Sequence, residues 1–212
     1  MLRPHGGVDC RLFATMKMAR MTAWSRFLFL RHGETDWNLQ GRFQGHSDIP
    51  LNATGLVQAR DAAAKLKSQT VHRIVSSPLV RALKTAAIVA EHIGLPIYVD
   101  SQFSERSFGS FDGQVIAEVK RQHGLAPSEL AHRIFPPDAE KWPQTLARSR
   151  AAIATWLDAH PAETILFVAH DGIFRALSEI LHGSWRESRH GTPYAFEPGP
   201  DTWTITEITA HA

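Results

Sequence analysis

The sequence predicts an α/β protein with a three-layer α/β/α architecture and a mostly parallel central sheet. Short apolar runs alternate along the chain with longer segments in which apolar residues recur at helical spacing. Residues 27–30 form a continuous apolar run, and residues 164–169 are the clearest strand in the chain. Strands that alternate with helices in this way favour a parallel sheet covered by helices on both faces.

The first half of the chain contains three predicted strands and two predicted helices. The strands are residues 27–30, 73–77 and 96–100, and the helices are residues 52–68 and 79–93. Pro78 ends the second strand, because proline has no amide hydrogen for the strand ladder. Leu79, Leu83 and Ala86 share one face of the second helix, and Gly94 ends it.

The second half begins with an irregular segment. Residues 101–143 hold three glycines and four prolines, so we expect loops there with one short helix near residues 115–123. A helix over 144–160 then precedes the strand over 164–169. Ile173, Phe174 and Leu177 recur at helical spacing until Gly183 ends the last helix. Two late strands, residues 192–196 and 203–208, complete the prediction.

Length and composition indicate one globular domain with an N-terminal extension. The chain has 212 residues, 43% hydrophobic and 21% charged, which excludes collagen, coiled coil and general disorder. We predict a single domain over residues 27–212 and a basic, disordered extension over residues 1–26. Cys10 is the only cysteine, so an internal disulfide and a cysteine-based zinc site are both excluded.

The charge distribution argues against a nucleic-acid partner. Residues 1–26 carry five basic side chains and one acidic side chain, whereas the remainder has 18 basic and 20 acidic side chains. The domain therefore lacks the excess basic charge of a nucleic-acid-binding protein. The sequence shows neither a membrane-spanning apolar run nor a secretory signal, so we expect a cytoplasmic protein without a membrane partner. The late strands would lie at a sheet edge, which leaves a homodimer open.

Basic residues gather where the predicted strands end. Ligands bind to open α/β sheets at the carboxyl ends of the strands. Arg31 and His32 follow the first strand, and Arg81 stands in the first turn of the helix after the second strand. His170 directly follows the strand over 164–169. Segments far apart in the sequence are thus expected to bring two arginines and two histidines together.

These side chains suit a phosphoryl group better than a metal ion. Two fixed guanidinium charges oppose a divalent cation, but they bind phosphate oxygens well. A neutral imidazole can attack phosphorus to form a phosphohistidine, while the arginines and the second histidine stabilise charge on the oxygens. The departing oxygen also needs a proton donor, and Glu105, in a glycine-bearing loop, is the candidate.

Longer motifs surround these residues. They are Arg31-His32-Gly33-Glu34-Thr35 with Asp36-Trp37-Asn38, Gly41-Arg42-Phe43-Gln44-Gly45, Ser76-Ser77-Pro78-Leu79-Val80-Arg81, Glu105 with Gly109 and Gly113, and Val168-Ala169-His170-Asp171-Gly172 with Arg175. Together they resemble the histidine phosphatase superfamily, the phosphoglycerate mutase-like proteins, over about residues 27–182. The resemblance implies a phosphoglycerate mutase-like fold and one catalytic domain.

The resemblance also implies a role for each residue. His32 would be the phosphorylated nucleophile, and Glu105 would act as general acid and later as base. Arg31, Arg81 and His170 would hold the phosphoryl group. The remaining phosphate- and substrate-binding residues would be Asn38, Gln44, Gly45 and Gly172. We also predict Asp171 as a binding residue, although the resemblance does not imply it. Neither a metal nor a cofactor is implied.

Asp171 departs from the family pattern, which often has glycine at this position. A carboxylate beside a phosphate site would oppose an anionic substrate unless it is turned away or paired. Contact with a substrate hydroxyl is the other interpretation.

We therefore predict a metal-independent phosphatase that hydrolyses a small phosphomonoester through a phosphohistidine intermediate. Phosphoglycerate mutase-type phosphoryl transfer is the nearest alternative. The compact segment between Gly113 and Thr164 disfavours it, because the cofactor-dependent mutases of this family carry a longer, more basic insertion there. A non-catalytic module that binds a phosphorylated ligand is a further alternative. The arginines disfavour a metal-dependent phosphohydrolase built on His170 and Asp171.

Overall fold

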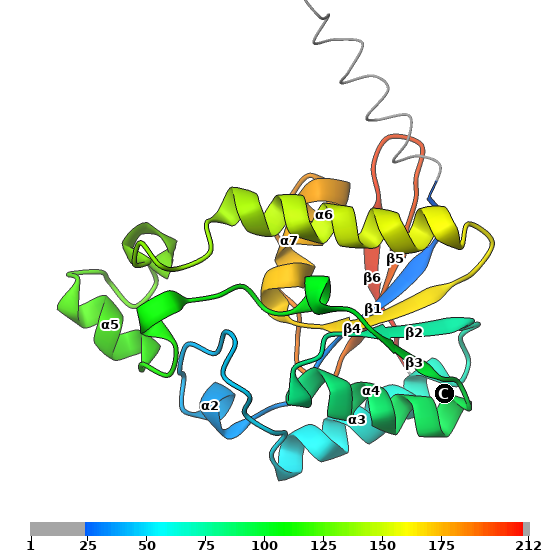
Figure 1. Ribbon diagram of the computed structural model, residues 1–212, viewed down its shortest axis with the longest axis horizontal. Coiled ribbons are helices and arrows are strands. Elements are labelled where there is room, and N and C mark those ends of the chain that lie inside the picture. The colour runs from blue at the N-terminus through cyan, green and yellow to red at the C-terminus, as the bar shows by residue number, and fades with distance from the viewer. Residues whose placement is uncertain (1–23, 210–212) are drawn as a thin grey trace, which may run out of the picture.

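The computed structural model describes residues 24–209, apart from the side chain of His132. Within this range, six strands form one sheet in the order β3-β2-β4-β1-β5-β6 (Figure 1). Their bounds are β1 Phe27–Arg31, β2 Arg73–Ser76, β3 Ile97–Val99, β4 Ile165–Ala169, β5 Pro193–Glu197 and β6 Thr204–Glu207. The first four strands are parallel, whereas β5 is antiparallel to both β1 and β6. The predicted α/β class with a mostly parallel sheet is confirmed.

Helices cover both faces of the sheet, as Figure 1 shows. Their bounds are α2 Asp36–Leu39, α3 Ala53–Leu66, α4 Val80–Ile93, α5 Ile116–Gln122, α6 Trp142–Ala159 and α7 Asp171–His182. Helices α3 and α4 share a hydrophobic core with one face of the sheet, and α6 and α7 share another core with the opposite face. This arrangement confirms the predicted three layers.

Strand β1 supplies side chains to both cores. Phe27 and Phe29 belong to the core on the α6 and α7 side, where the ring of Phe27 stacks on Phe196 with the centroids 4.7 Å apart. Leu28 and Leu30 belong to the core on the α3 and α4 side. Successive side chains of a strand point to opposite faces. A strand between two layers of helices therefore needs the continuous apolar run that the sequence shows.

The parallel register brings three strand ends to one edge of the sheet. Strands β1 and β2 both pair with β4, which lies between them. Just past these strands, the His32 N–H donates to the Ala169 carbonyl at 3.0 Å, and the Ser77 N–H donates to the Val168 carbonyl at 3.0 Å. His32, Ser77 and His170 consequently follow neighbouring strands at the same edge.

Two predicted glycine stops end their helices in the same way. Gly94 and Gly183 lie at the C-terminal ends of α4 and α7 with φ of +79° and +78°. Glycine adopts this left-handed conformation without the steric cost that a Cβ would add.

Gly33 is required for a different reason, which is a close approach between segments. A Cβ on Gly33 would lie 2.3 Å from the carbonyl oxygen of Gly55 in the first turn of α3. That turn is fixed by Asn52, whose side chain caps the helix by accepting from the Gly55 N–H at 2.8 Å. The residue after the first histidine must therefore lack a side chain for α3 to pack here.

The segment over residues 101–143 is more regular than predicted. Besides α5, which lies where a short helix was expected, it contains the 3-10 turns Ser101–Phe103, Gly109–Phe111 and Ala131–Ile134. Phe43, Phe111 and Val119 form a third, smaller core beneath it. Helix α6 begins at Trp142 rather than at residue 144, with Pro143 in its first turn. Proline is tolerated there because a first-turn amide has no partner within the helix.

The start of the domain lies slightly before residue 27. Trp24 is buried, and its Nε1 donates to Asp158 in α6 at 2.8 Å. Arg26 pairs with Glu197 of β5 at 2.9 Å. Both residues fall in the predicted extension, yet they pack on the domain. The prediction of disorder for residues 1–23 lies outside the described residues.

No helix within residues 24–209 is both long enough and apolar enough to cross a lipid bilayer.

Two leucines on neighbouring helices test this packing. Leu66 of α3 is fully buried, whereas Leu39 of α2 is 73% exposed. We expect Leu66→Ala to lower the free energy of unfolding by about 2–5 kcal/mol, because it removes buried methyl groups and leaves a cavity. The matched control, Leu39→Ala, should change it by less than about 0.5 kcal/mol. Urea unfolding followed by circular dichroism measures both, and equal losses would contradict the layer assignment.

Candidate active site

His32 lies almost completely buried at the end of β1, and its hydrogen bonds define its tautomer. Its Nδ1 lies 2.7 Å from the Gly33 carbonyl oxygen, which only accepts, so Nδ1 carries the proton. Its Nε2 accepts from the Arg81 Nε at 3.3 Å, because a guanidinium only donates. Burial, and then the positive charges of Arg81 and Arg31, lower the pKa of His32 well below its usual value. The ring is therefore neutral, with its lone pair beside Arg81.

Arg81 is fully buried in the first turn of α4. Its two terminal nitrogens donate to the carbonyl oxygens of Ser47 at 2.9 Å and Gly45 at 2.8 Å. Among residues 24–209, no carboxylate forms an ion pair with it. Burial lowers the pKa of Arg81 to about 10, so the group remains charged at neutral pH. A buried cation held only by neutral groups favours an anionic ligand.

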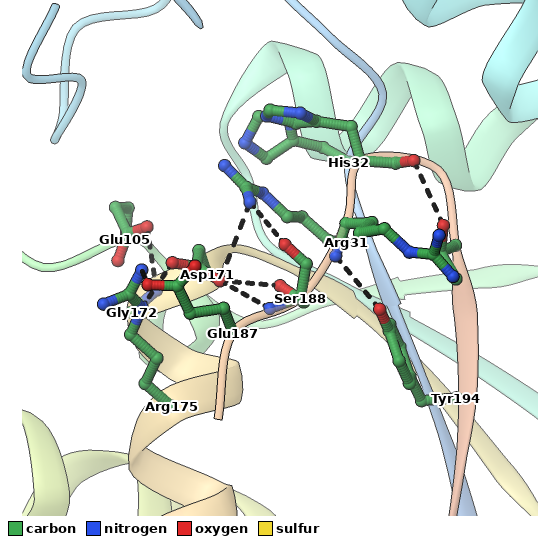
Figure 2. A network of polar contacts seen from close by, with 12 residues as sticks. Arg31, His32, Glu105, Asp171, Gly172, Arg175, Glu187, Ser188 and Tyr194 are labelled. Carbon is green, nitrogen blue, oxygen red and sulfur yellow. Dashed lines mark hydrogen bonds and ion pairs between the residues drawn. The ribbon is translucent and has the colours of Figure 1, made fainter. Parts of the chain in front are cut away.

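Arg31, the last residue of β1, holds a second buried charge in the same region. Its Nη1 donates to the Ser188 carbonyl at 2.7 Å and lies 3.6 Å from the Asp171 carboxylate (Figure 2). Its Nε is buried and has no hydrogen-bonding partner among the described residues. Burial lowers the pKa of Arg31, although the charges of Asp171 and Glu105 oppose the shift.

His170 precedes α7 and lies beside His32, with the ring centroids 5.1 Å apart. Its Nε2 is 2.8 Å from the Ser77 hydroxyl, and its buried Nδ1 has no partner within the described part of the chain. Burial, followed by the charge of Arg81, lowers the pKa of His170 well below its usual value. The imidazole is neutral, with one ring nitrogen free to bind a ligand.

Glu105 is anchored by backbone amides on two sides. Its Oε1 accepts from the Arg106 N–H at 2.8 Å, and its Oε2 accepts from the Gly172 N–H at 3.1 Å. A Cβ on Gly172 would lie 2.1 Å from the Glu105 Oε1, so a side chain here would push the carboxylate out of this position. Burial raises the pKa of Glu105, and the two backbone hydrogen bonds partly offset that shift.

The structure answers the question that Asp171 poses, because its carboxylate is paired. Its Oδ1 accepts from the backbone N–H of Ser188 at 2.9 Å and from the hydroxyl of Ser188 at 2.8 Å. Its Oδ2 forms an ion pair with Arg175, and Arg31 lies near its Oδ1 (Figure 2). Burial alone would raise the pKa of Asp171, but the charges of Arg31 and Arg175 lower it on balance.

The predicted binding residues from the first loop make mostly internal contacts. The Asn38 side-chain oxygen accepts from the N–H and the hydroxyl of Thr35, at 3.1 and 3.0 Å, in a capping box of α2. The Gln44 Oε1 lies 2.8 Å from the same hydroxyl and shares its single proton with Asn38, while the Gln44 Nε2 is buried without a partner among the described residues. Gly45 contributes its carbonyl oxygen to Arg81.

Ser77 and His190 lie at this site but were not among the site residues predicted from the sequence, although Ser77 belongs to one of the motifs quoted above. Ser77 contacts His170, and the rule that strand ends carry ligand-binding residues would have found it. His190 has its ring centroid 5.6 Å from that of His32. It precedes β5, whose N-terminal end meets the site because β5 is antiparallel to β1. A rule about the carboxyl ends of strands cannot detect such a residue.

Across residues 24–209, with the His132 side chain left aside, no three His, Cys, Asp or Glu side chains are grouped so that they could hold a metal ion. The charges of Arg31 and Arg81 act in the same direction, since they oppose a divalent cation.

Comparison with known proteins gives the family. The model of the histidine phosphatase superfamily (branch 1) matches residues 27–208. This chain belongs to the histidine phosphatase superfamily, which confirms the resemblance seen in the motifs.

Individual relatives include both phosphatases and mutase-like proteins. The uncharacterized phosphatase PhoE of Bacillus subtilis is 38% identical over 154 residues, which cover 73% of this chain and 76% of that protein. Phosphoglycerate mutase-like protein 4 of Arabidopsis thaliana is 33% identical over 170 residues, which cover 77% of this chain and 74% of that protein. A mycobacterial glucosyl-3-phosphoglycerate phosphatase solved with VO3 superposes with a TM-score of 0.78 at 29% identity, covering 88% of this chain and all of that one. The chain is thus a phosphoryl-transfer enzyme of this family.

The neutral imidazoles predict how stability depends on pH. The pKa values of His32, His170 and His190 all lie below the value of about 6.5 expected in the unfolded chain. Above that pH each histidine is neutral in both the folded and the unfolded chain. As the pH falls below it, the unfolded chain takes up protons that the folded chain does not, so stability is lost until the pH reaches the folded pKa. Each histidine should therefore cost up to about 1.4 kcal/mol of unfolding free energy per pH unit below pH 6.5.

Substitution of one histidine isolates this effect. His170→Gln should reduce the stability lost between pH 6.5 and 5.5 by up to about 1.4 kcal/mol, as measured by urea unfolding at each pH. His92→Gln, on the exposed end of α4, is the matched control. An unchanged pH dependence in His170→Gln would contradict a neutral His170.

Proposed function

We propose that this chain is a metal-independent phosphatase that hydrolyses a small phosphomonoester through a phosphohistidine at His32. The observation that carries the proposal is the hydrogen bonding of His32. Nδ1 is occupied by the Gly33 carbonyl at 2.7 Å, which leaves the Nε2 lone pair beside the Arg81 guanidinium at 3.3 Å. A nucleophile is thus placed where a phosphate oxygen would bind to a buried cation.

The first proposed step transfers the phosphoryl group to the enzyme. The Nε2 lone pair of His32 attacks phosphorus, and the bond between phosphorus and the ester oxygen breaks. The ester oxygen keeps the bonding electrons and takes a proton from Glu105, whose raised pKa supports a protonated carboxyl. Arg31, Arg81 and His170 stabilise the charge on the other three oxygens.

The second proposed step regenerates the enzyme. A water molecule attacks phosphorus and gives a proton to the Glu105 carboxylate, so that the same group now acts as a base. The bond between phosphorus and the His32 Nε2 breaks, and inorganic phosphate leaves. His32 returns to its neutral form, which its lowered pKa favours.

Of the residues predicted to bind substrate, we expect Gln44 to make direct contact. Its buried Nε2 is a donor without a partner among the described residues, and buried donors are rarely left unpaired. Gly45 and Gly172 would act through their neighbours, because one positions Arg81 and the other positions Glu105.

Phosphoglycerate mutase activity is the second candidate. It differs in that a hydroxyl group of a second molecule, rather than water, would take the phosphoryl group from His32. The mutase-like relative in Arabidopsis supports this candidate. The solved relative that is named a phosphatase and carries VO3 supports hydrolysis.

A rapid-quench experiment tests the proposal. The protein is mixed with p-nitrophenyl phosphate in excess EDTA, quenched within milliseconds and examined by mass spectrometry. We expect an acid-labile phosphoryl adduct on His32 together with accumulating phosphate, and no adduct in His32→Ala. An adduct that persists without phosphate release would favour the mutase. Turnover that EDTA abolishes would contradict a metal-independent reaction.

The role of Glu105 is tested by varying the leaving group. Glu105→Gln should slow hydrolysis of an alkyl phosphate such as glycerol 2-phosphate by about 10²–10⁴-fold, because an alkoxide needs a proton as it departs. Hydrolysis of p-nitrophenyl phosphate should be slowed far less, since p-nitrophenolate leaves without protonation. The kcat/KM values of both substrates decide the matter, because they report the first step, whereas kcat also contains the attack of water in which Glu105 serves as base. An equal loss of kcat/KM for the two substrates would remove Glu105 from the acid role.

A further inference from the structure

We propose that His190 is a further substrate-binding residue, which donates a hydrogen bond from Nε2 to an oxygen of the phosphoryl group. The inference rests on the proposed phosphatase function and adds a residue to its site. His190 lies in the segment between α7 and β5, outside every motif that carries the family resemblance.

The position of His190 places an imidazole at the nucleophile. Its ring centroid is 5.6 Å from that of His32, close to the 5.1 Å that separates His32 from His170. Its Nε2 is buried and has no hydrogen-bonding partner within residues 24–209. The same is true of the Arg31 Nε and the His170 Nδ1. His32 thus has three neighbours that each keep a buried nitrogen without a partner among the described residues, as expected of a site that binds an anion.

The backbone on both sides of His190 is fixed. The Gly191 N–H donates to the carbonyl oxygens of Arg31 at 3.1 Å and His32 at 3.3 Å. On the other side, the Arg189 N–H donates to the Tyr194 hydroxyl at 3.0 Å. The residue before the imidazole and the residue after it are therefore tied to β5 and to the end of β1. Such a position is suited to holding a ligand-binding group in place.

Asp171 holds the start of the same segment, as Figure 2 shows. Its Oδ1 accepts both the N–H and the hydroxyl of Ser188, while the Ser188 carbonyl accepts from Arg31 at 2.7 Å. The Glu187 carboxylate forms an ion pair with Arg175, and Arg175 also forms an ion pair with Asp171. The carboxylate that departs from the family pattern thus positions the segment that carries His190.

The chemistry of His190 suits an oxyanion. Burial, and then the charge of Arg31, lower the pKa of His190 to about 3, so the ring is neutral at physiological pH. A neutral imidazole has one N–H to donate, and the oxygens of a bound phosphoryl group only accept. The nearby guanidinium groups would repel a cationic ligand, which leaves an anion as the fitting partner.

Two amide variants and one apolar variant test the hydrogen bond in the full-length chain. In His190→Gln the side-chain amide nitrogen reaches about as far as Nε2, whereas in His190→Asn it reaches only as far as Nδ1. His190→Leu removes the donor altogether, and His92→Gln, on the exposed end of α4, is the matched control. Isothermal titration calorimetry with inorganic phosphate and with orthovanadate measures binding without turnover. Steady-state kinetics with p-nitrophenyl phosphate measures KM and kcat.

We expect His190→Leu and His190→Asn to weaken binding of both anions about tenfold or more, as loss of a hydrogen bond to a charged group does. The affinity of His190→Gln for both anions should stay within about threefold of the wild type. This change is smaller than the loss of a hydrogen bond to a charged group would cause. The KM for p-nitrophenyl phosphate should rise in the same order.

Wild-type affinity in His190→Leu would overturn the proposal, and so would equal weakening by Gln, Asn and Leu, which would indicate a packing role. If His190→Leu does not fold, as judged by circular dichroism, the comparison of Gln with Asn decides.

Failure of the phosphatase function itself gives a different pattern. In that case the wild type would neither bind orthovanadate nor hydrolyse p-nitrophenyl phosphate, and the role of His190 would fall with it. A wild type that binds and turns over while every His190 variant matches it would refute the His190 proposal alone.

Discussion

The burial of the Arg81 charge is the constraint on which the rest of the site depends. A guanidinium removed from water is costly unless its donors are satisfied. Here the carbonyl oxygens of Gly45 and Ser47 accept from the guanidinium, so the loop before α3 must direct these two carbonyl groups toward Arg81. Asp112 holds that loop in shape by accepting from the N–H groups of both residues, at 2.6 and 3.0 Å. Phe111, which directly precedes Asp112, is buried in the small third core and so helps to fix the position of Asp112.

Burial and the nearby guanidinium charges together keep the neighbouring imidazoles neutral. Burial is the main cause of the lowered pKa of His32, His170 and His190, and the guanidinium charges add to it in each case. The site therefore attracts anions through its arginines while its histidines stay unprotonated. These two conditions are what a nitrogen nucleophile needs when its target carries negative charge.

The sequence was sufficient to predict the layers, the sheet class and the residues after the parallel strands. This succeeds because β1, α4 and α7 follow simple periodic patterns and end at residues with a clear physical signal, such as Gly94 and Gly183. Contacts made across the fold were not predictable in this way. The pairing of Asp171 with Ser188 depends on how an irregular segment returns to α7, and the burial of Trp24 depends on where α6 lies. His190 reaches the site from the start of an antiparallel strand, which no local pattern marks.

The contact between Glu105 and the first turn of α7 balances two opposing influences on one proton. Burial favours the neutral acid, while the N–H of Gly172, which donates to the carboxylate from the positive end of a helix, favours the anion. A carboxyl group held between these influences can release its proton and recover it without any movement of the backbone. The proposed two-step reaction requires this reversibility, because in it Glu105 would donate a proton once and accept a proton once. Because Gly172 has no side chain, the end of α7 can approach Glu105 closely enough for its backbone N–H to reach the carboxylate.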